Sequence, residues 1–579
     1  MKTSNSRLST LLNAKYWEFF IPTILMAMTT TMSIVVDGII VGNMLGATAL
    51  AAVNLVMPIM MVYTTIAVLF GMGGATLISI AKGKQQPDKA NSVFTLSLLV
   101  MLILSAILLI TQRLYLNEIS ALITQEPELQ SLVKSYLHAL LYGTPMITLT
   151  FGLTYCLRVD ARVKLASAVL IVANLVNLAL DLLYMGPLQM GIFGSSLATV
   201  SGYSAGALML IPYATSKKRT LRLNWNFTGV SHVFKELWLI ISTGSPAAMG
   251  GALITLKMLT VNTIVLSVAG KSGMVAFSVC LSCLSLISMF ISGAAQAMMP
   301  IAGVLYGERD YAGIQIVVKQ AFQVLTVAAI IVLFILETMP ILVLELFGVS
   351  SASDLAVGVP AIRIFAVSLL GTSISFLAMY YYMTIGQKKL ANAIAIVQGY
   401  LIVAPASYLL SASMGENGIW LAFSIAEAVT ILMIFCSFTY LKQSQPQKYS
   451  NILLLDQTLL PPQKIFEQTL SDKNTNMSPV AKYLTETGHS QEEVKSIIDK
   501  TEEIIIGILR AKPPKAQLFV DIRVRSDQNK ITFNLRDDGK GNTPAETNPA
   551  PFPQNGFTLA VTPSQAIGFN NTTLTYTKS

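Results

Sequence analysis

Ionisable and amide side chains lie inside otherwise apolar stretches of this sequence. Asp37 stands in TMSIVVDGIIVGNML, and Asp181 stands in NLVNLALDLLYM after Asn174 and Asn177. Asn177 and Asp181 are four residues apart and Asn174 precedes Asn177 by three, so a helix places them on one face. A charged group at the bilayer centre costs roughly 2.5–3.5 kcal/mol, so its presence predicts a function. Two carboxylates with amide oxygens can bind H⁺ or Na⁺, although Asp181 is also near enough to a span end to reach the interface.

Three more charged residues interrupt later apolar runs: Lys257 in the seventh, Arg363 in the tenth and Glu427 in the last. Lys257 and Glu427, together with Asn174, are candidates to line a substrate cavity. Arg363 and Glu427 lie close enough to loops that structural pairing explains them equally well. The three histidines show no ligand spacing, and we predict no metal site, no cofactor and no enzyme activity.

The elements that position these residues are membrane spans. Of the 579 residues, 53% are hydrophobic and only 12% are charged, which is typical of a chain whose main solvent is lipid. A spanning helix needs roughly 20 apolar residues. Such runs predict about twelve spans, near residues 17–41, 54–80, 92–111, 134–157, 164–184, 190–213, 236–268, 274–305, 317–341, 355–383, 390–412 and 417–440.

The loops between these spans alternate in charge. The basic set consists of Lys82, Lys84 and Lys89; Arg158, Arg162 and Lys164; Lys217, Lys218, Arg219 and Arg222; Arg309; and Lys388 with Lys389. The other set is nearly free of Lys and Arg apart from Arg113 and Lys271. The positive-inside rule therefore places both termini in the cytoplasm and the protein in the plasma (inner) membrane. Because the net charge of +9 is spread over short loops, a nucleic-acid partner is not expected.

The two halves of the hydrophobic region resemble each other. ARVKLASA (161–168) matches GQKKLANA (386–393), and MGIFGSSLA (190–198) returns loosely as NGIWLAFSI (417–425). Six spans separate the copies, so both have one orientation and form parallel repeats. We expect six-helix bundles over 1–222 and 223–441 that enclose a central cavity. Such a cavity suits a carrier.

The composition turns polar after the last span. Residues 442–475, with QSQPQ and LLPPQ, read as a linker, and 476–579 read as a cytoplasmic α/β sandwich. Within it we expect a helix over 478–488 and a second helix from the Ser490/Glu493 capping box to about Arg510. Strands are expected over 517–525, 530–536 and 572–578. The fold class is therefore an all-α polytopic membrane protein with a small C-terminal α/β domain.

The hydrophobic region resembles the MATE (multidrug and toxic compound extrusion) family. The resemblance rests on VDGIIVGNMLGATALAAV (35–52), GMGGATLISIAKGKQQPDKA (71–90) and NLVNLALDLLYMGPLQMGIFGSSLAT (174–199), and it extends over about residues 10–440. It implies an N-terminal cation site made of Asp37, Asn177, Asp181 and Thr199. Some members carry a glutamate on the seventh helix, but AAMGGALITLKML after Pro246 has Lys257 instead. A C-terminal Na⁺ site of that type is therefore not expected.

The soluble domain resembles the anti-sigma-factor/serine-kinase branch of histidine-kinase-like ATPases. Asp537, Gly539 and Gly541 stand where that fold has its adenine-recognising DxGxG. Where the family has the asparagine that holds Mg²⁺, this chain has Gly507. The resemblance therefore implies a degenerate regulatory or docking module without ATP binding, while a tight turn explains DDGKG without nucleotide. Such a module could gate transport or bind a cytosolic protein partner, and the sequence does not choose between the two.

We expect a monomeric secondary transporter that exports small amphipathic or cationic compounds by H⁺ or Na⁺ antiport. No P-loop (GxxxxGK[ST]) occurs, so transport driven by the chain's own ATP hydrolysis is not expected. Two alternatives stay open. A flippase for lipids or polysaccharide precursors would show a strongly basic cavity, for which Lys257, Arg363 and Arg158 are available. A membrane sensor would signal through the C-terminal domain.

Overall fold

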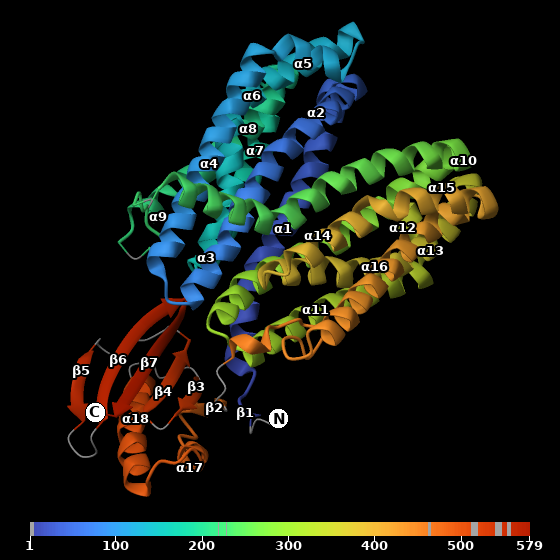
Figure 1. Ribbon diagram of the computed structural model, residues 1–579. Coiled ribbons are helices and arrows are strands. Elements are labelled where there is room, and N and C mark those ends of the chain that lie inside the picture. The colour runs from blue at the N-terminus through green and yellow to red at the C-terminus, as the bar shows by residue number, and fades with distance from the viewer. Residues whose placement is uncertain are drawn as a thin grey trace. The chain divides into compact units, whose positions relative to one another are not determined.

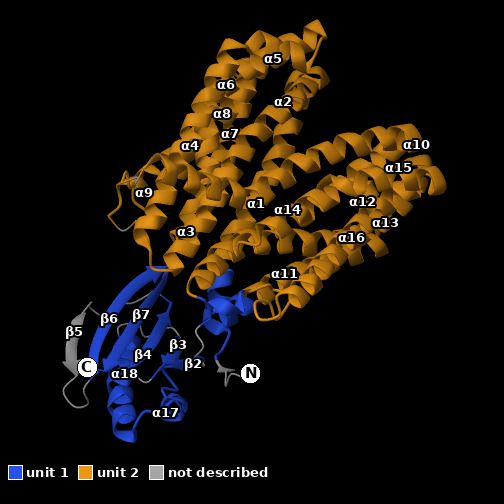
Figure 2. Cartoon of the chain, viewed as in Figure 1, with its two compact units in different colours: residues 1–17, 309–316, 456–579 blue, residues 18–308, 317–455 orange. Residues whose placement is uncertain are grey.

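The structure is a computed structural model that describes residues 5–217, 219–226, 229–460, 465–510, 519–527, 529–538, 547–552 and 557–578. The chain divides into two compact units (Figure 2). Unit 1 comprises residues 1–17, 309–316 and 456–579, and unit 2 comprises residues 18–308 and 317–455. Unit 1 therefore joins the soluble C-terminal segment with two short pieces from the helical part of the sequence.

The helices of the first half follow the predicted spans (Figure 1). They are α1 (Thr10–Leu45), α2 (Ala47–Ile66), a π-helical segment (Ala67–Met72), α3 (Gly73–Gly83), α4 (Pro87–Leu114), α5 (Leu116–Ile123), α6 (Pro127–Val159), α7 (Val163–Met185), α8 (Gly191–Leu208) and α9 (Ile211–Thr215). The first helix begins earlier than the predicted residue 17, because the residues before Trp17 continue the helix.

The second half starts with α10 (Val230–Gly307), which bends at Gly270, where φ is 58° and ψ is −147°. This break lies between the predicted spans 236–268 and 274–305 and divides α10 into two arms. The remaining helices are α11 (Tyr311–Thr338), α12 (Pro340–Leu346), α13 (Ala352–Thr384), α14 (Lys388–Ile396), a π-helical segment (Val397–Leu401), α15 (Val403–Met414) and α16 (Glu416–Ser444). In the described chain, eleven continuous helices are long and apolar enough to cross a membrane. Because α10 contributes two arms, these helices account for the expected twelve spans.

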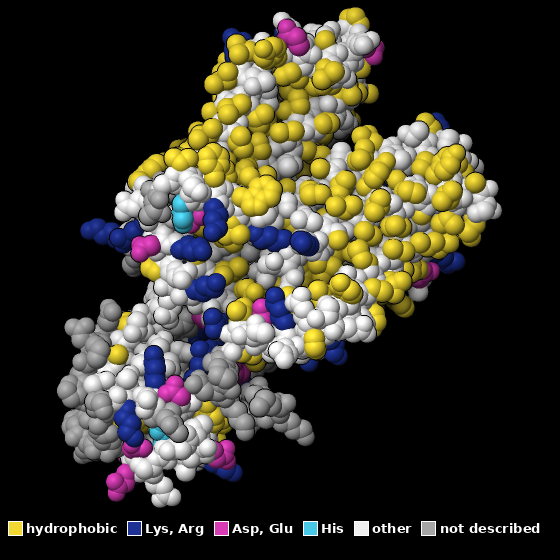
Figure 3. All heavy atoms as spheres, viewed as in Figure 1, with side chains coloured by type: hydrophobic (Ala, Val, Ile, Leu, Met, Phe, Trp, Pro, Cys, Tyr) yellow, Lys and Arg dark blue, Asp and Glu magenta, His cyan; other side chains and the backbone are white. Residues whose placement is uncertain are grey.

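Apolar side chains cover the outside of these helices. On the face shown in Figure 3, hydrophobic residues spread over the long helices of unit 2. On α11, for example, Val327, Ile330, Ile331 and Phe334 are between 51% and 66% exposed. A surface of this kind fits lipid tails, so the chain is a multi-pass membrane protein.

Glycines bring α3 into backbone contact with both arms of α10. A Cβ on Gly73 would lie 2.6 Å from the carbonyl oxygen of Ile240 on the first arm. A Cβ on Gly83 would strike the carbonyl oxygen of Val304 on the second arm. Small residues allow membrane helices to approach this closely. Helix α3 of the first half is thus packed directly against the start and the end of α10.

Unit 1 contains one seven-stranded sheet in the order β1-β2-β3-β4-β7-β6-β5. The strands are β1 (Asn5–Ser6), β2 (Ile465–Ser471), β3 (Phe519–Ser526), β4 (Lys530–Asp537), β5 (Thr547–Phe552), β6 (Phe557–Ala566) and β7 (Phe569–Lys578). β1 and β2 are parallel, and the other neighbours are antiparallel. The predicted hairpin of β3 and β4 and the final strand are confirmed. Residues 517–518 of the predicted first strand lie outside the described residues.

The helices α17 (Ser478–Glu486) and α18 (Gln491–Arg510) match the predicted ones. The capping box is formed as expected: the backbone N–H of Ser490 donates to the Glu493 carboxylate at 3.0 Å, and the N–H of Glu493 donates to Ser490 Oγ at 3.3 Å. The linker prediction over 442–475 was wrong in part, because this range contains the end of α16 and strand β2. The polar residues of β2 are buried by partners distant in sequence.

Alternating side chains give the sheet two different faces. Ile522 and Val524 of β3 join the apolar core with Leu484 of α17 and Ile497 of α18. The intervening Arg523 and the neighbouring Glu467 and Arg536 are also buried, although they carry charge. This charged face is where the N-terminal segment and residues 309–316 make their contacts.

Candidate functional site

In the first bundle, α7 and α8 bring three of the predicted site residues together. Asn177 Nδ2 donates to Asp181 Oδ2 at 3.0 Å and lies 3.4 Å from Thr199 Oγ1. Asp181 is fully buried, while Asn177 and Thr199 are half-buried. The i, i+4 spacing on α7 thus has the geometry that the sequence indicated.

Asp37 of α1 completes this cluster. Its carboxyl group lies close enough to that of Asp181 for the two to share a hydrogen bond. Among the described residues, the Oδ1 atoms of both aspartates are buried without a hydrogen-bond partner. A buried oxygen without a partner is costly unless a proton or cation binds it. The four residues implied by the family resemblance therefore lie together in one cluster.

Sequence reasoning missed Tyr136 at this site. Its buried phenol, on α6, lies within hydrogen-bonding reach of Thr199 and close to both carboxylates. A tyrosine in an apolar run gives no sequence signal of such a role, because aromatic side chains are ordinary packing residues there. Asn174 lies one turn away from the cluster, where its Nδ2 donates to Thr30 Oγ1 on α1 at 3.0 Å.

In the second bundle, Lys257 of α10 and Glu427 of α16 line one cavity of about 280 Å³. Both side chains are almost completely buried, with exposures of 5% and 7%. Glu427 Oε1 accepts hydrogen bonds from Thr372 Oγ1 at 2.8 Å and from Gln398 Nε2 at 3.1 Å. Gln398 belongs to the second π-helical segment, a local widening that is frequent at functional sites. Asn174, the third cavity candidate, does not line this cavity.

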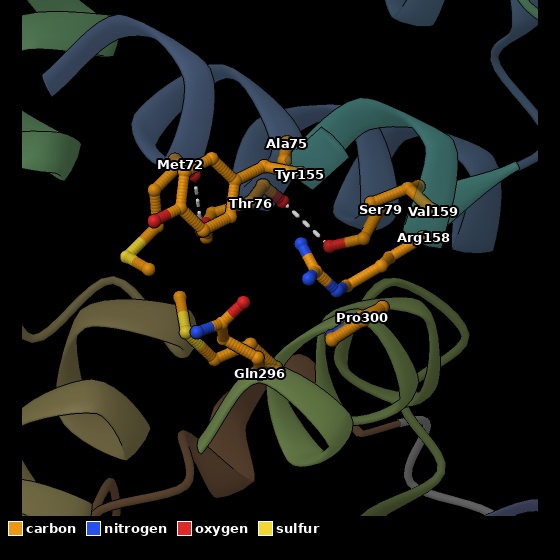
Figure 4. A pocket seen from close by; sticks show the side chains of 10 residues that line it. Met72, Ala75, Thr76, Ser79, Tyr155, Arg158, Val159, Gln296 and Pro300 are labelled. Carbon is orange, nitrogen blue, oxygen red and sulfur yellow. Dashed lines mark hydrogen bonds between the residues drawn. The ribbon is translucent and has the colours of Figure 1, made fainter. Parts of the chain in front are cut away.

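Arg158 of α6 lines a separate cavity of about 20 Å³ (Figure 4). In this view its guanidinium and the amide of Gln296, from α10, point into the cavity from opposite sides. Arg363 of α13 is exposed instead, and its Nε lies 4.0 Å from Glu337 Oε2. The three cations considered for a basic flippase cavity, Arg158, Lys257 and Arg363, therefore lie at three different places.

Unit 1 contains a buried charge cluster around Asp310. Asp310 Oδ1 accepts from Arg7 Nη1 at 2.8 Å, and Oδ2 accepts from Arg536 Nη1 at 3.0 Å. Arg7 Nη2 also lies 3.1 Å from Asp521 Oδ2, and Arg523 Nε lies 2.8 Å from Glu467 Oε1. Although burial raises the pKa of Asp310, the neighbouring arginines lower it more and hold it well below its usual value. The residues come from the start of the chain, from the 309–316 segment and from the sheet.

The nucleotide motif is described only in part. Asp537 is buried at the end of β4, and its Oδ1 lies 3.3 Å from Asn570 Nδ2. Gly539 and Gly541 lie outside the described residues. Gly507 stands on α18 with open space where its Cβ would be.

Comparison with known proteins identifies relatives of the helical region. The MatE family profile matches residues 22–183 and again 246–409, one match in each bundle. The multidrug export protein MepA of Staphylococcus haemolyticus (strain JCSC1435) is 22% identical over 384 residues, which cover 66% of this chain and 83% of MepA. The probable multidrug resistance protein YoeA of Bacillus subtilis (strain 168) is 23% identical over 461 residues, with 75% of this chain and 96% of YoeA covered.

Solved structures show the same fold. A MATE protein in complex with MaL6 superposes with a TM-score of 0.69 at 21% identity, over 75% of this chain and 99% of that one. A multidrug resistance MATE family transporter of the MOP superfamily in an outward-facing conformation gives a TM-score of 0.68 at 22% identity, over 76% and 100%. Each match leaves about a quarter of this chain uncovered.

Proposed function

Since this chain belongs to the MatE (multidrug and toxic compound extrusion) family, we propose that it is a secondary active exporter of amphipathic compounds, driven by H⁺ antiport. The names of MepA and YoeA support the export of drug-like molecules. Two similar bundles in one orientation suit alternating access, because a site between them can open to either side. The basic loops support a cytoplasmic location for both termini.

The neighbouring carboxyl groups of Asp37 and Asp181 are the observation that supports proton coupling. Two carboxylates this close repel each other when both are ionised, so the pair favours binding one proton. Asn177 donates to Asp181 and stabilises the charged form when that proton leaves. The site can therefore take up a proton and release it without a large rearrangement.

Dye transport into proteoliposomes with an imposed pH gradient tests this proposal. In Na⁺-free buffer, the wild type should move ethidium against its gradient while dissipating the pH gradient, and Asp37→Asn and Asp181→Asn should each abolish both. Glu118→Gln changes an exposed carboxylate on α5 and should transport like the wild type. Transport that continues in the two aspartate variants would refute coupling at this site. Transport that needs Na⁺ rather than a pH gradient would replace H⁺ as the coupling ion.

The two alternatives predict other results in the same assay. A flippase would move no dye, and the separate positions of Arg158, Lys257 and Arg363 give it no common basic cavity. A pure sensor would also move no dye, and it would have no need of a carboxyl pair. Dye movement by the wild type therefore separates an exporter from both.

We propose in addition that the C-terminal domain regulates transport. Its support is the composition of unit 1, which contains the first turns of α1 and α11 along with the sheet. These helices belong to different bundles, which must move relative to each other during alternating access. One folded unit that holds the start of both helices would restrain this motion, and Asp310 is the residue through which it holds α11.

Transport rates of Asp310 variants test the regulatory role. Asp310→Asn weakens the hold on the segment before α11 and should change the initial rate of dye transport at a constant pH gradient. Asp472→Asn, an exposed position in the same unit, is the matched control and should leave the rate unchanged. Equal rates in the wild type and Asp310→Asn would contradict regulation through this contact.

A further inference from the structure

The cavity of the second bundle contains two opposite charges without a direct ion pair. Lys257 and Glu427 act on each other electrostatically, but no ion pair or hydrogen bond joins them in the described part of the chain. A buried charge without a close partner is strongly unfavourable, and removing one partner of a buried pair leaves the other at that cost. The arrangement therefore needs a reason beyond packing.

Each of the two charges has unused binding capacity. Glu427 uses Oε1 for Thr372 and Gln398, whereas its Oε2 is buried without a partner among the described residues. The Lys257 ammonium lies 5.7 Å from the centre of the Phe423 ring, and this cation–π contact does not occupy its N–H donors. The carboxylate can still accept from a cation, and the ammonium can still donate to an anion.

The internal repeat places this pair where the first bundle has its acidic site. The second family match begins at residue 246, so Lys257 lies on the part of the chain that repeats α1, which carries Asp37. Glu427 lies on α16, the last helix of its bundle, as Thr199 lies on α8 of the first. One bundle thus presents two acids, and the other presents an acid and a base. The two sites cannot prefer the same ligand.

We propose that the second-bundle cavity binds zwitterionic aromatic compounds, with their anionic group at Lys257 and their cationic group at Glu427. The walls suit the rest of such a molecule, because they carry aromatic rings and hydroxyl groups. The rings belong to Phe365, Phe376 and Phe423, and the hydroxyl groups include those of Ser285 and Ser368. A compound with only a cation meets the repulsion of Lys257. This inference rests on the proposed export function and names the substrate class of this cavity.

Equilibrium binding of two related dyes tests the proposal. Tetramethylrhodamine carries a xanthene cation and a carboxylate, and its methyl ester carries the same cation without the anion. Fluorescence polarisation of each dye with the purified full chain in detergent gives the ratio of their dissociation constants. The wild type should bind the zwitterion at least ~10-fold more tightly than the ester, since one buried charge contact separates the two.

Variants of each charge then locate the preference. Lys257→Met should lower the ratio to about 1 without weakening the ester, whereas Lys257→Arg should keep the preference, because it keeps the positive charge. Glu427→Gln should weaken both dyes, because both contain the cation. A wild-type ratio near 1, or a ratio that Lys257→Met leaves unchanged, would overturn the proposal. Ester binding that Lys257→Met retains at wild-type strength excludes a folding defect as the cause of its lower ratio.

The binding ratio can be separated from the failure of export. Asp37→Asn is expected to stop transport, but it lies in the other bundle and should leave the ratio unchanged. If the wild type binds the zwitterion selectively and moves neither dye, the cavity assignment stands and the export function is wrong. If it moves dye without any preference in binding, export stands and the cavity assignment is wrong.

Discussion

Replacing Asp310 by Asn should loosen the charged face of unit 1 more than any surface change there. The carboxylate is completely buried and accepts from Arg7 and Arg536, and the backbone N–H of Gly313 donates to it at 2.9 Å. Asparagine keeps the shape and removes the charge, so guanidinium groups remain buried with fewer counter-charges. Breaking a buried pair in this way costs about 3–5 kcal/mol.

Hydrogen exchange of the full chain measures this cost locally. Because each 1.4 kcal/mol is a factor of ten, amides of β2 and β3 should exchange at least ~100-fold faster in Asp310→Asn. Amides of α7, in the first bundle of unit 2, provide an internal reference, and Asp472→Asn is the control variant. Exchange in β2 and β3 that matches the wild type would refute the view that Asp310 stabilises this face.

The same contact has a defined dependence on pH. A carboxyl group whose pKa is lower in the folded protein stabilises the fold above its unfolded value of about 3.9, and loses this contribution as the pH falls through the folded value. The pKa of Asp310 is held well below that range. The difference in exchange between the wild type and Asp310→Asn should therefore be constant at neutral pH and should shrink only below about pH 4. A difference that vanishes near pH 6 would point to another group.

Three further changes test other contacts. Ser490→Ala removes the hydroxyl half of the capping box and should destabilise the start of α18 by about 1 kcal/mol, seen as faster exchange of its first amides, whereas Ser490→Asp should not. Gly83→Val places a side chain against the Val304 carbonyl and should lower the apparent Tm of the detergent-solubilised chain, while Gly251→Val, where the space is open, should leave it unchanged. Thr372→Val takes one hydrogen bond from buried Glu427 and should cost about 1–3 kcal/mol, read as a lower apparent Tm that Thr372→Ser restores; an unchanged Tm would mean that Gln398 alone satisfies the carboxylate.

The sequence predicted those features that depend on local pattern. Apolar run length indicated the spans, and Gly270 separates two of them because a residue with positive φ ends a helical path. The spacing of Asn177 and Asp181 indicated their shared face on α7. Ser490 and Glu493 marked the start of α18. Apart from run length, each of these follows from residues fewer than about two turns apart.

Features that depend on distant partners were not predicted. Strand β2 reads as linker because Glu467 and Gln468 are polar, yet Arg523 pairs with Glu467 and buries it. Strand β6 contains Pro563, which argues against a strand although β7 pairs with it. Asp310 lies in a short loop that the sequence marks only by its basic neighbour Arg309. Its partners are hundreds of residues away, so no local pattern indicates them.

The glycine contacts between α3 and α10 have a mechanical consequence. Gly73 and Gly83 touch backbone on the two arms of α10, so at these two points the surfaces meet without interlocking side chains. Only dispersion contacts, each about 0.1–0.2 kcal/mol, are lost where such smooth surfaces part. No rotamer change at either glycine has to precede a slide or a roll of the helices. The seam can therefore act as a low-friction bearing, strong enough to close over many atoms and free to reopen without a trigger of its own.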